Sequence, residues 1–216
     1  MSYQMVYDLL NATGETLYMV FFSTFFAIIL GLPFGILLFS STRIKANPTL
    51  NKLLSALINI LRSIPFIILL VAIIPLTRLI VGTSIGINAA IVPLTIGATP
   101  FFARLVDNAL QALPLGLIET GYSMGASTRQ IIQYIILPEA KPGIIHAITV
   151  TAITLINYSA MAGAVGAGGL GTLAINYGYQ RFNAGVMLST VIVLIILVQL
   201  VQVVGDFIAK RSSVNN

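Results

Sequence analysis

The feature that most constrains the fold of this chain is a series of apolar runs long enough to cross a lipid bilayer. A helix needs about 20 mainly apolar residues to cross a hydrocarbon core about 30 Å thick. Five stretches meet or approach this length, at about residues 17–39, 63–79, 87–103, 144–164 and 186–204. The second is short, and we expect Arg62 and Arg78 to extend it by reaching towards the two membrane surfaces. The sequence therefore predicts an all-α integral membrane protein with five transmembrane helices.

The composition supports a lipid environment and excludes several functions. Hydrophobic residues make up 57% and charged residues 8% of the 216 positions, whereas soluble domains carry about 25% charged residues. The chain contains no cysteine, which excludes disulfides and cysteine-based metal or catalytic sites. The single histidine, His146, lies near the start of a predicted span, and we assign it no catalytic or metal role. We expect one transmembrane domain over residues 1–216.

The positions of lysine and arginine predict the orientation, because cytoplasmic loops of membrane proteins are enriched in these residues. With the N-terminus outside and the C-terminus in the cytoplasm, only Arg78 and Arg181 lie outside. The cytoplasmic side then holds Arg43, Lys45, Lys52, Arg62, Arg104, Arg129, Lys141, Lys210 and Arg211. We interpret the net charge of +5 as this topology signal and expect no nucleic-acid partner.

Residues 107–143 contain no apolar run of membrane length and are predicted to form two short helices in the cytoplasm. Gly125 is a stop signal for the first helix, and Ser127 with Gln130 has the spacing of a capping box that starts the second. Apolar faces at helical spacing are formed by Leu115, Ile118 and Tyr122, and by Ile131, Ile132, Ile135 and Ile136. Such a pair is typical of a docking element for a protein or for the membrane surface, and a plain structured loop is the alternative.

Uncharged polar residues cluster in the fourth predicted span, which makes it the candidate lining of a translocation path. The candidates are Thr151, Thr154, Asn157, Tyr158, Ser159 and Met161, and we expect the flexible Met161 to help close the path. Hydrogen bonds from these side chains to their own or a neighbouring helix are the alternative. A charge at the bilayer centre costs about 2.5–3.5 kcal/mol, and the predicted spans keep their charges near their ends. The absence of an intramembrane acid or histidine favours a passive path that another subunit's energy opens.

No motif for catalysis or nucleotide binding accompanies these helices. The sequence lacks Gly-x-x-x-x-Gly-Lys-Ser/Thr, the loop that binds ATP phosphates. Residues 166–171 match the Gly-x-Gly-x-x-Gly pattern of dinucleotide sites, but they follow a membrane-length run, and no acidic residue lies between Glu139 and Asp206. We interpret them as a tight external turn where backbones pack closely. We expect no enzymatic activity, metal or cofactor in this chain; ATP and Mg would bind a separate subunit.

The cytoplasmic segment resembles a motif of bacterial binding-protein-dependent ABC importer permeases. That motif reads Glu-Ala-Ala, three residues, Gly, nine residues, Ile, one residue, Leu-Pro. With the same spacing, this chain has Glu119, Thr120, Gly121, Gly125, Ala126, Ile135, Leu137 and Pro138. Thr120 and Gly121 depart from the two alanines. The resemblance implies a coupling helix seated in a groove of the ATPase subunit, with Glu119 as a polar anchor and Gly125 as a hinge.

The resemblance covers nearly the whole chain. Residues 62–86, 89–94 and 157–171 look like the methionine-importer permeases. This implies the type I ABC importer permease fold in a multi-pass protein of the bacterial inner membrane. It also implies a homodimer in contact with membrane lipid, two ATP-binding subunits and an extracytoplasmic lipoprotein that delivers L- or D-methionine. The expected function is an alternating-access path for methionine, driven by ATP hydrolysis on the partner subunits.

Three alternative functions can be compared with the sequence. A permease of the same type for another amino acid or an organic ion remains open, because the delivery protein largely selects the cargo. A secondary transporter or channel is disfavoured by the missing intramembrane charge and by the docking segment. An intramembrane hydrolase is disfavoured because no cysteine exists and no Ser–His or paired-acid arrangement occurs within the spans.

Overall fold

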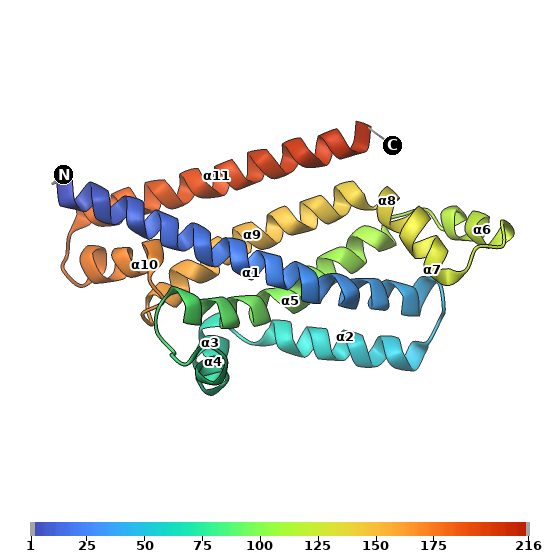
Figure 1. Cartoon of the computed structure of the whole chain (residues 1–216), viewed down its shortest axis with the longest axis horizontal. Helices are drawn as coiled ribbons and strands as arrows, with labels where there is room; N and C mark the ends of the chain where they lie inside the picture. Colours follow the sequence, from blue (N-terminus) through green and yellow to red (C-terminus); the bar gives the residue numbers. More distant parts are fainter. Residues whose placement is uncertain (1–2, 215–216) are drawn as a thin grey trace.

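Long helices dominate the computed structural model, which describes residues 3–214 (Figure 1). Among these residues, four helices are long and apolar enough to cross a membrane. They are α1 (Tyr3–Arg43), α5 (Ile87–Gln111), α9 (Lys141–Gly163) and α11 (Ala184–Val214). A bent pair of shorter helices, Pro48–Ser63 and Phe66–Ala72, gives up to five spans if it is counted as one.

The remaining helices are short and connect or cap the long ones. They are α2 (Pro48–Ser63), α3 (Phe66–Ala72), α4 (Ile74–Val81), α6 (Gly116–Ser123), α7 (Thr128–Gln130), the π-helical segment η1 (Ile131–Ile136), α8 (Leu137–Glu139), α10 (Gly169–Leu173) and the π-helical segment η2 (Ala174–Tyr179).

The second predicted span, residues 63–79, is divided differently in the structure. Its residues fall in α3 and α4, while the 16-residue α2 precedes them and is bent by 95° from α3. The bend falls at Pro65, and Ile64 before it has extended backbone, with ψ of 122°. A residue preceding proline is driven out of the helical region by the proline ring, so α2 must end there. If the bent pair is counted as one span, that span begins with α2 at Pro48, 15 residues before the predicted start at residue 63.

The long helices run along the long axis of the molecule, and α6, α7 and α8 gather at one end of it (Figure 1). We call this the α6 end and the opposite one the N-terminal end. Helices α1, α5 and α11 finish at or towards the α6 end, while α2 and α9 start there. The two described termini lie at opposite ends of the long axis, as an odd number of crossings requires.

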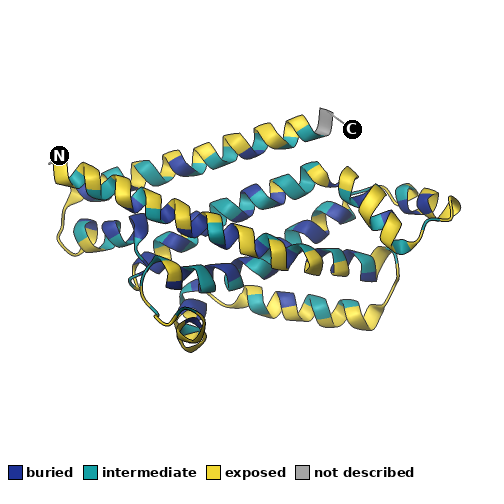
Figure 2. Ribbon diagram, in the orientation of Figure 1, coloured by how far each residue is buried: buried dark blue, intermediate teal, exposed yellow. Residues whose placement is uncertain are grey.

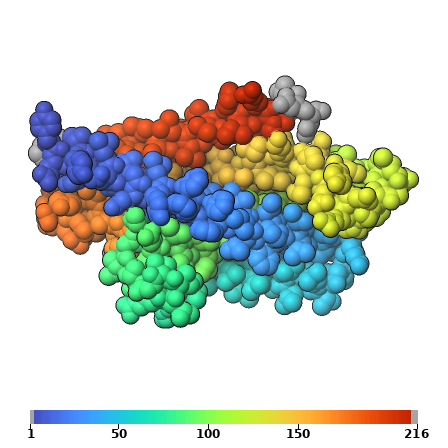
Figure 3. All heavy atoms as spheres, viewed as in Figure 1, coloured from blue at the N-terminus to red at the C-terminus, as the bar shows by residue number. Residues whose placement is uncertain are grey.

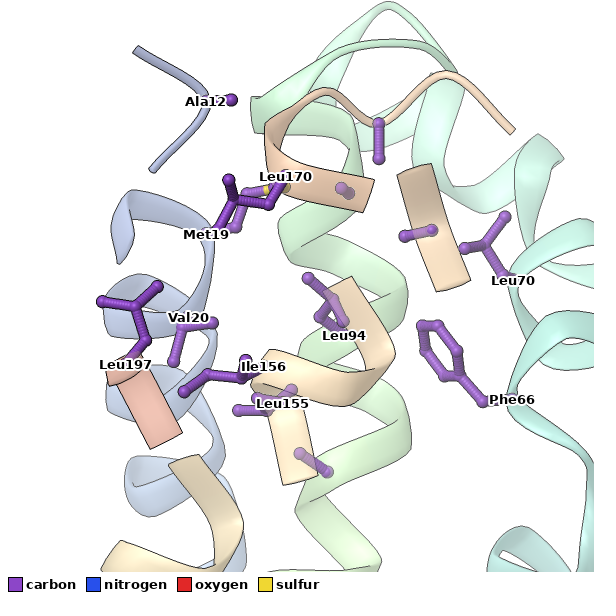
Figure 4. Packing of buried hydrophobic residues seen from close by; sticks show 14 of the residues in the cluster. Ala12, Met19, Val20, Phe66, Leu70, Leu94, Leu155, Ile156, Leu170 and Leu197 are labelled. Carbon is purple, nitrogen blue, oxygen red and sulfur yellow. The ribbon is translucent and has the colours of Figure 1, made fainter. Parts of the chain in front are cut away.

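Two apolar clusters hold the helices together, and most of the outer surface of α11 is exposed (Figure 2). The cluster nearer the N-terminal end joins α1, α3, α5, α9 and α10; Met19, Leu94, Leu155 and Leu170 are fully buried in it (Figure 4). The cluster nearer the α6 end joins α1 and α5 to the short helices through residues such as Phe102, Ile131 and Ile136. The short helices are therefore packed onto the ends of the long ones.

Glycines on α1 allow its close packing against α5. A Cβ atom added at Gly35 would lie 2.7 Å from the carbonyl oxygen of Ala103 and from Val106, and one at Gly31 would lie 2.9 Å from Phe102. In lipid, such small residues replace the hydrophobic effect as the main source of helix association, because they let backbones approach.

Replacing Gly35 with leucine is expected to separate α1 from α5 and to lower the melting temperature of the purified protein. Overpacking a tight contact costs about 1–3 kcal/mol, and here the obstacle includes backbone. Gly14→Leu is the matched control, because a Cβ at Gly14 meets nothing within 4 Å. Thermal unfolding in detergent measures both variants, and equal melting temperatures would contradict the packing role of Gly35.

Candidate coupling segment and translocation path

The segment between α5 and α9 folds as two short helices joined at a glycine, as the sequence predicted. Gly125 has a left-handed backbone with φ of 74°. The amide of Ala126 donates to the Gly121 carbonyl at 3.0 Å, and that of Gly125 donates to the Tyr122 carbonyl at 2.9 Å. This pair of bonds is a Schellman motif, the usual end of a helix that is followed by a left-handed glycine.

The capping box that starts the second helix is confirmed. The amide of Gln130 donates to the Ser127 hydroxyl at 3.4 Å, and the amide of Ser127 donates to the Gln130 side chain at 2.8 Å. This helix continues through η1 and α8, past Leu137 and Pro138, to Glu139, and α9 begins at Lys141. Proline would clash with the carbonyl four residues before it in a regular α-helix, and the wider π-helical turn directly before Pro138 avoids this.

We expect Gly125→Ala to weaken the junction between the two helices, because an L-residue in this conformation costs about 1–2 kcal/mol. Amide hydrogen exchange of residues 125 and 126 should accelerate about 5- to 30-fold in the variant. Gly116→Ala is the control, since Gly116 lies in the same segment, has open space around it and has no positive φ. Unchanged exchange at both amides would rule out this role for Gly125.

Gly121 is one of the two departures from the motif, and the packing of α6 explains why glycine is found there. A Cβ atom at this position would lie 2.8 Å from Ile131 and 3.0 Å from Ile135. The absence of a side chain lets α6 lie close against η1, with Ile118 buried between them and the long helices. Leu137 packs against the same cluster. Ile118 of α6 therefore shares one apolar cluster with Phe39 of α1 and Phe102 of α5.

The outward surface of this segment combines polar and large apolar side chains. Glu119, Thr120 and Tyr122 are exposed on α6, and Met124 and Tyr134 are 78% and 74% exposed. The segment protrudes beyond the ends of the long helices (Figure 3). Exposed methionine and tyrosine at a protruding tip are typical of a protein-docking surface.

A chain of polar side chains links three helices. Arg104 of α5 forms an ion pair with Asp107 at 3.2 Å and also donates to Asn59 of α2 at 3.1 Å. Gln111 donates to Asp107 at 3.3 Å and accepts from Arg43 of α1 at 2.8 Å. The chain joins α1, α2 and α5, and its contact with α2 is at Asn59, in the second half of that helix.

The structure separates the six path candidates on α9 into two groups. Thr151 and Ser159 are buried, at 0% and 2% exposed, and donate to the carbonyls of Ala147 and Ile156 on their own helix. Within this subunit the alternative explanation therefore holds for these two. The open face of α9 is instead formed, at helical spacing, by Thr154, Asn157, Tyr158 and Met161. Thr154 also donates to its own helix, at the Val150 carbonyl.

A cavity of about 230 Å³ opens beside this face, between α2, α3, α5 and α9. Its lining includes Arg62, Phe66, Phe101 and Tyr158. The rings of Phe66 and Tyr158 stack at 4.4 Å, and the Arg62 guanidinium lies 5.8 Å from the centre of the Phe101 ring. The cavity thus combines flat aromatic walls with one permanent positive charge.

Arg62 lies at the opposite end of α2 from Pro48, although the sequence analysis expected it on the same side of the membrane as Lys45 and Lys52. It is in the last turn of α2, about 21 Å along the helix from Pro48. Among the described residues, no carboxylate lies within 4 Å of its guanidinium. Charged side chains within membrane segments are costly and usually mark a functional site. The sequence analysis did not identify Arg62 as a cavity residue, because the predicted span started one residue after it.

A polar stripe on α2 leads to this cavity and was also missed. Asn51, Ser55, Asn59 and Arg62 are spaced by four, four and three residues, so they share one face of the helix. A polar face on a membrane helix must contact protein or water, because lipid cannot satisfy it. The spacing of these four residues could have revealed the stripe. They lie between the first and second predicted spans, where the sequence analysis predicted no helix.

Glycine-rich backbone closes the N-terminal end of the molecule. Gly166, Gly168 and Gly169 all have positive φ, which confirms the tight turn expected there. The Glu15 carboxylate accepts the amide of Gly169 at 2.6 Å, and the Thr16 hydroxyl accepts that of Leu170 at 2.9 Å. These side chains of α1 satisfy the free amides at the start of α10.

Apolar helices of membrane length, a docking segment at one end and a polar cavity between the helices define a multi-pass membrane permease. Residues 27–214 match the family model of the binding-protein-dependent transport system inner membrane component. The chain belongs to this family, and it is therefore a transport permease of the bacterial inner membrane.

Individual relatives agree with this assignment. The chain is 52% identical to the probable D-methionine transport system permease protein MetI of Vibrio cholerae, over 94% of this chain and 91% of the relative. It is 55% identical to the D-methionine transport system permease protein MetI of Escherichia coli K12, over 76% of each chain.

Solved structures share the fold. A chain described under inward-facing conformations of the MetNI methionine ABC transporter matches with a TM-score of 0.96 and 54% identity, over 98% of this chain and 99% of that one. A chain of an amino acid ABC transporter matches with a TM-score of 0.79 and 19% identity, over 96% and 95%. The fold is that of type I ABC importer permeases.

Proposed function

We propose that this chain is the permease subunit of an ATP-driven importer for methionine, in its L or D form or both. The support is the identity above 50% over most of the chain to permeases named for D-methionine transport. The cavity suits this cargo chemically: aromatic rings make favourable contacts with a thioether sulfur, and a guanidinium pairs with a carboxylate.

The energy would come from two separate ATPase subunits that dock against α6. The observation that carries this proposal is the protruding surface of Glu119, Thr120, Tyr122, Met124 and Tyr134 on helices packed directly onto α1 and α5. Closure of the ATPase dimer would move α6 and thereby tilt the long helices. The α6 end is then cytoplasmic and the N-terminus outside, in agreement with the clustering of lysine and arginine at the α6 end.

The path would be completed by a second copy of the chain. In one copy, Asn59 and Arg62 of α2 and Asn157 and Met161 of α9 are exposed, whereas Asn51 is already bound to Ser41 and Thr42 of α1. Polar faces cannot be left against lipid, so pairing two copies across them would enclose a polar path. Met161, 41% exposed on that face, would supply a flexible apolar constriction. An extracytoplasmic binding lipoprotein would deliver the cargo at the N-terminal end.

Labelled-methionine uptake tests the proposal. The chain, purified with the ATPase that accompanies it, is placed in vesicles together with the binding protein, with ATP present or absent on the α6 side. We expect uptake only with ATP, and competition by unlabelled methionine but not by other amino acids. Selective uptake of a different amino acid would support the permease role but contradict methionine as the cargo. Purification without any ATPase would overturn the coupling role of α6.

A further inference from the structure

An apolar groove lies between α9 and α11, outside the path. It has a volume of about 430 Å³ and opens to the surface of the subunit. Its walls include Ile148 and Ala152 of α9 and Leu200, Val201 and Val204 of α11. The two helices touch where Gly205 meets Thr149, since a Cβ at Gly205 would overlap the threonine side chain. The groove is therefore a fixed depression beside a close helix contact.

At the α6 end, the groove continues into a second cavity of about 300 Å³ that is cationic. The two cavities share Ile145 and Ile208, so they are continuous. Lys141, in the first turn of α9, and Arg211, in the last turn of α11, line the second cavity. Neither has a carboxylate within 4 Å among the described residues.

A buried hydroxyl in the same cavity also lacks a partner. Ser212 lines the cavity, and its Oγ atom is inaccessible and has no hydrogen-bond partner among the described residues. A buried hydroxyl without a partner costs about 1–3 kcal/mol, and rotation of this side chain towards the mouth would let it donate to an acceptor there. Two exposed cations thus converge at one mouth, beside a hydroxyl that lacks a partner.

The dimensions match one leaflet of a bilayer. From Lys141 to Ala152 the groove follows α9 for about 16 Å, and half of the hydrocarbon core is about 15 Å. The charges lie at the end of the helices and the apolar walls extend inwards, which is the order of groups along a phospholipid from its headgroup to the end of its acyl chain. Basic pockets at helix ends on the cytoplasmic side are known to favour anionic headgroups.

We propose that this groove binds one anionic phospholipid, with an acyl chain along α9 and α11 and the phosphate at Lys141, Arg211 and Ser212. The apolar length distinguishes a lipid from a free phosphate, which would use only the mouth. The two cations distinguish an anionic lipid from a zwitterionic one. The site involves none of the residues assigned to the path or to the docking surface.

Native mass spectrometry of the complete transporter, supplied with phosphatidylglycerol or phosphatidylcholine of the same chain length, tests this site. We expect retention of phosphatidylglycerol, reduced about fivefold for each cation removed in Lys141→Gln and Arg211→Gln. The control is Lys45→Gln with Lys52→Gln, which removes two charges near the same end but outside the groove. Ala152→Phe should reduce retention with both charges intact, because it fills the apolar part.

Three results would overturn the proposal. One is equal retention of the two lipids, and another is unchanged retention in the Lys141 and Arg211 double variant. The third is efficient disulfide formation between two copies through Ala152→Cys, which would identify a second copy as the occupant. None of these readouts depends on the cargo, so they stand apart from the methionine assignment.

Discussion

Replacing Arg62 with glutamine is expected to reduce methionine uptake about 10- to 100-fold while leaving assembly with the ATPase intact. Hydrogen bonds to charged groups contribute about 1.5–3 kcal/mol, and Arg62 carries the one charge in the cavity lining. Uptake by Arg62→Lys should lie between that of Arg62→Gln and that of the parent protein, because lysine keeps the charge but lacks the planar guanidinium that donates two parallel hydrogen bonds. Uptake into vesicles and the amount of co-purified ATPase measure the two properties separately.

Arg78→Gln provides the control for this experiment. Arg78 is also at the end of a short helix, but it donates to Ser84 at 3.2 Å and does not line the cavity. We expect its uptake to stay within about twofold of the parent protein. If Arg62→Gln transports as well as Arg78→Gln, the guanidinium does not contact the cargo.

Reversing the charge of Glu119 to lysine is expected to lower the amount of co-purified ATPase at least tenfold. Glu119 is exposed on α6 in the centre of the proposed docking surface, and like charges brought together at an interface cost several kcal/mol. If some complex survives, its ATP hydrolysis should no longer respond to the binding protein. Glu119→Gln, which removes the charge without reversing it, should have a smaller effect.

Glu139→Lys makes the same change of charge at another exposed acid near the same end of the molecule. Because Glu139 lies on α8 and not on α6, we expect normal assembly. Equal loss in the two variants would indicate a general charge effect, and normal assembly and coupling of Glu119→Lys would contradict the assignment of α6.

Periodicity and turn chemistry were sufficient to predict most of the fold. The long apolar runs gave four of the spanning helices, and Gly125 and Ser127 marked the boundary between the two short helices because both features act over only a few residues. The helix that precedes the second predicted span was not anticipated, because hydropathy recognises only uniformly apolar helices. Helix α2 carries a polar stripe, and Pro65, which ends it, had been placed inside a span.

The path was harder to predict for a related reason. Residue type identified the polar side chains of α9, but not the direction in which each one points. Thr151 and Ser159 face the interior of the subunit, whereas Asn157 and Met161 face outwards. The contribution of Arg62 depends on contacts with Phe101 and on the stacked pair of Phe66 and Tyr158, which come from four separate segments. Such long-range contacts have no signature in local spacing.

The bonds from α1 to the start of α10 also order the events of biogenesis. Glu15 and Thr16 each bind an amide that is 154 residues further along the chain. The first helix consequently enters the bilayer long before the ribosome has produced the residues that fix its outer end. The contacts of Gly31 and Gly35 with α5 become available earlier, so the bonds to α10 complete a register that α5 has already begun to define.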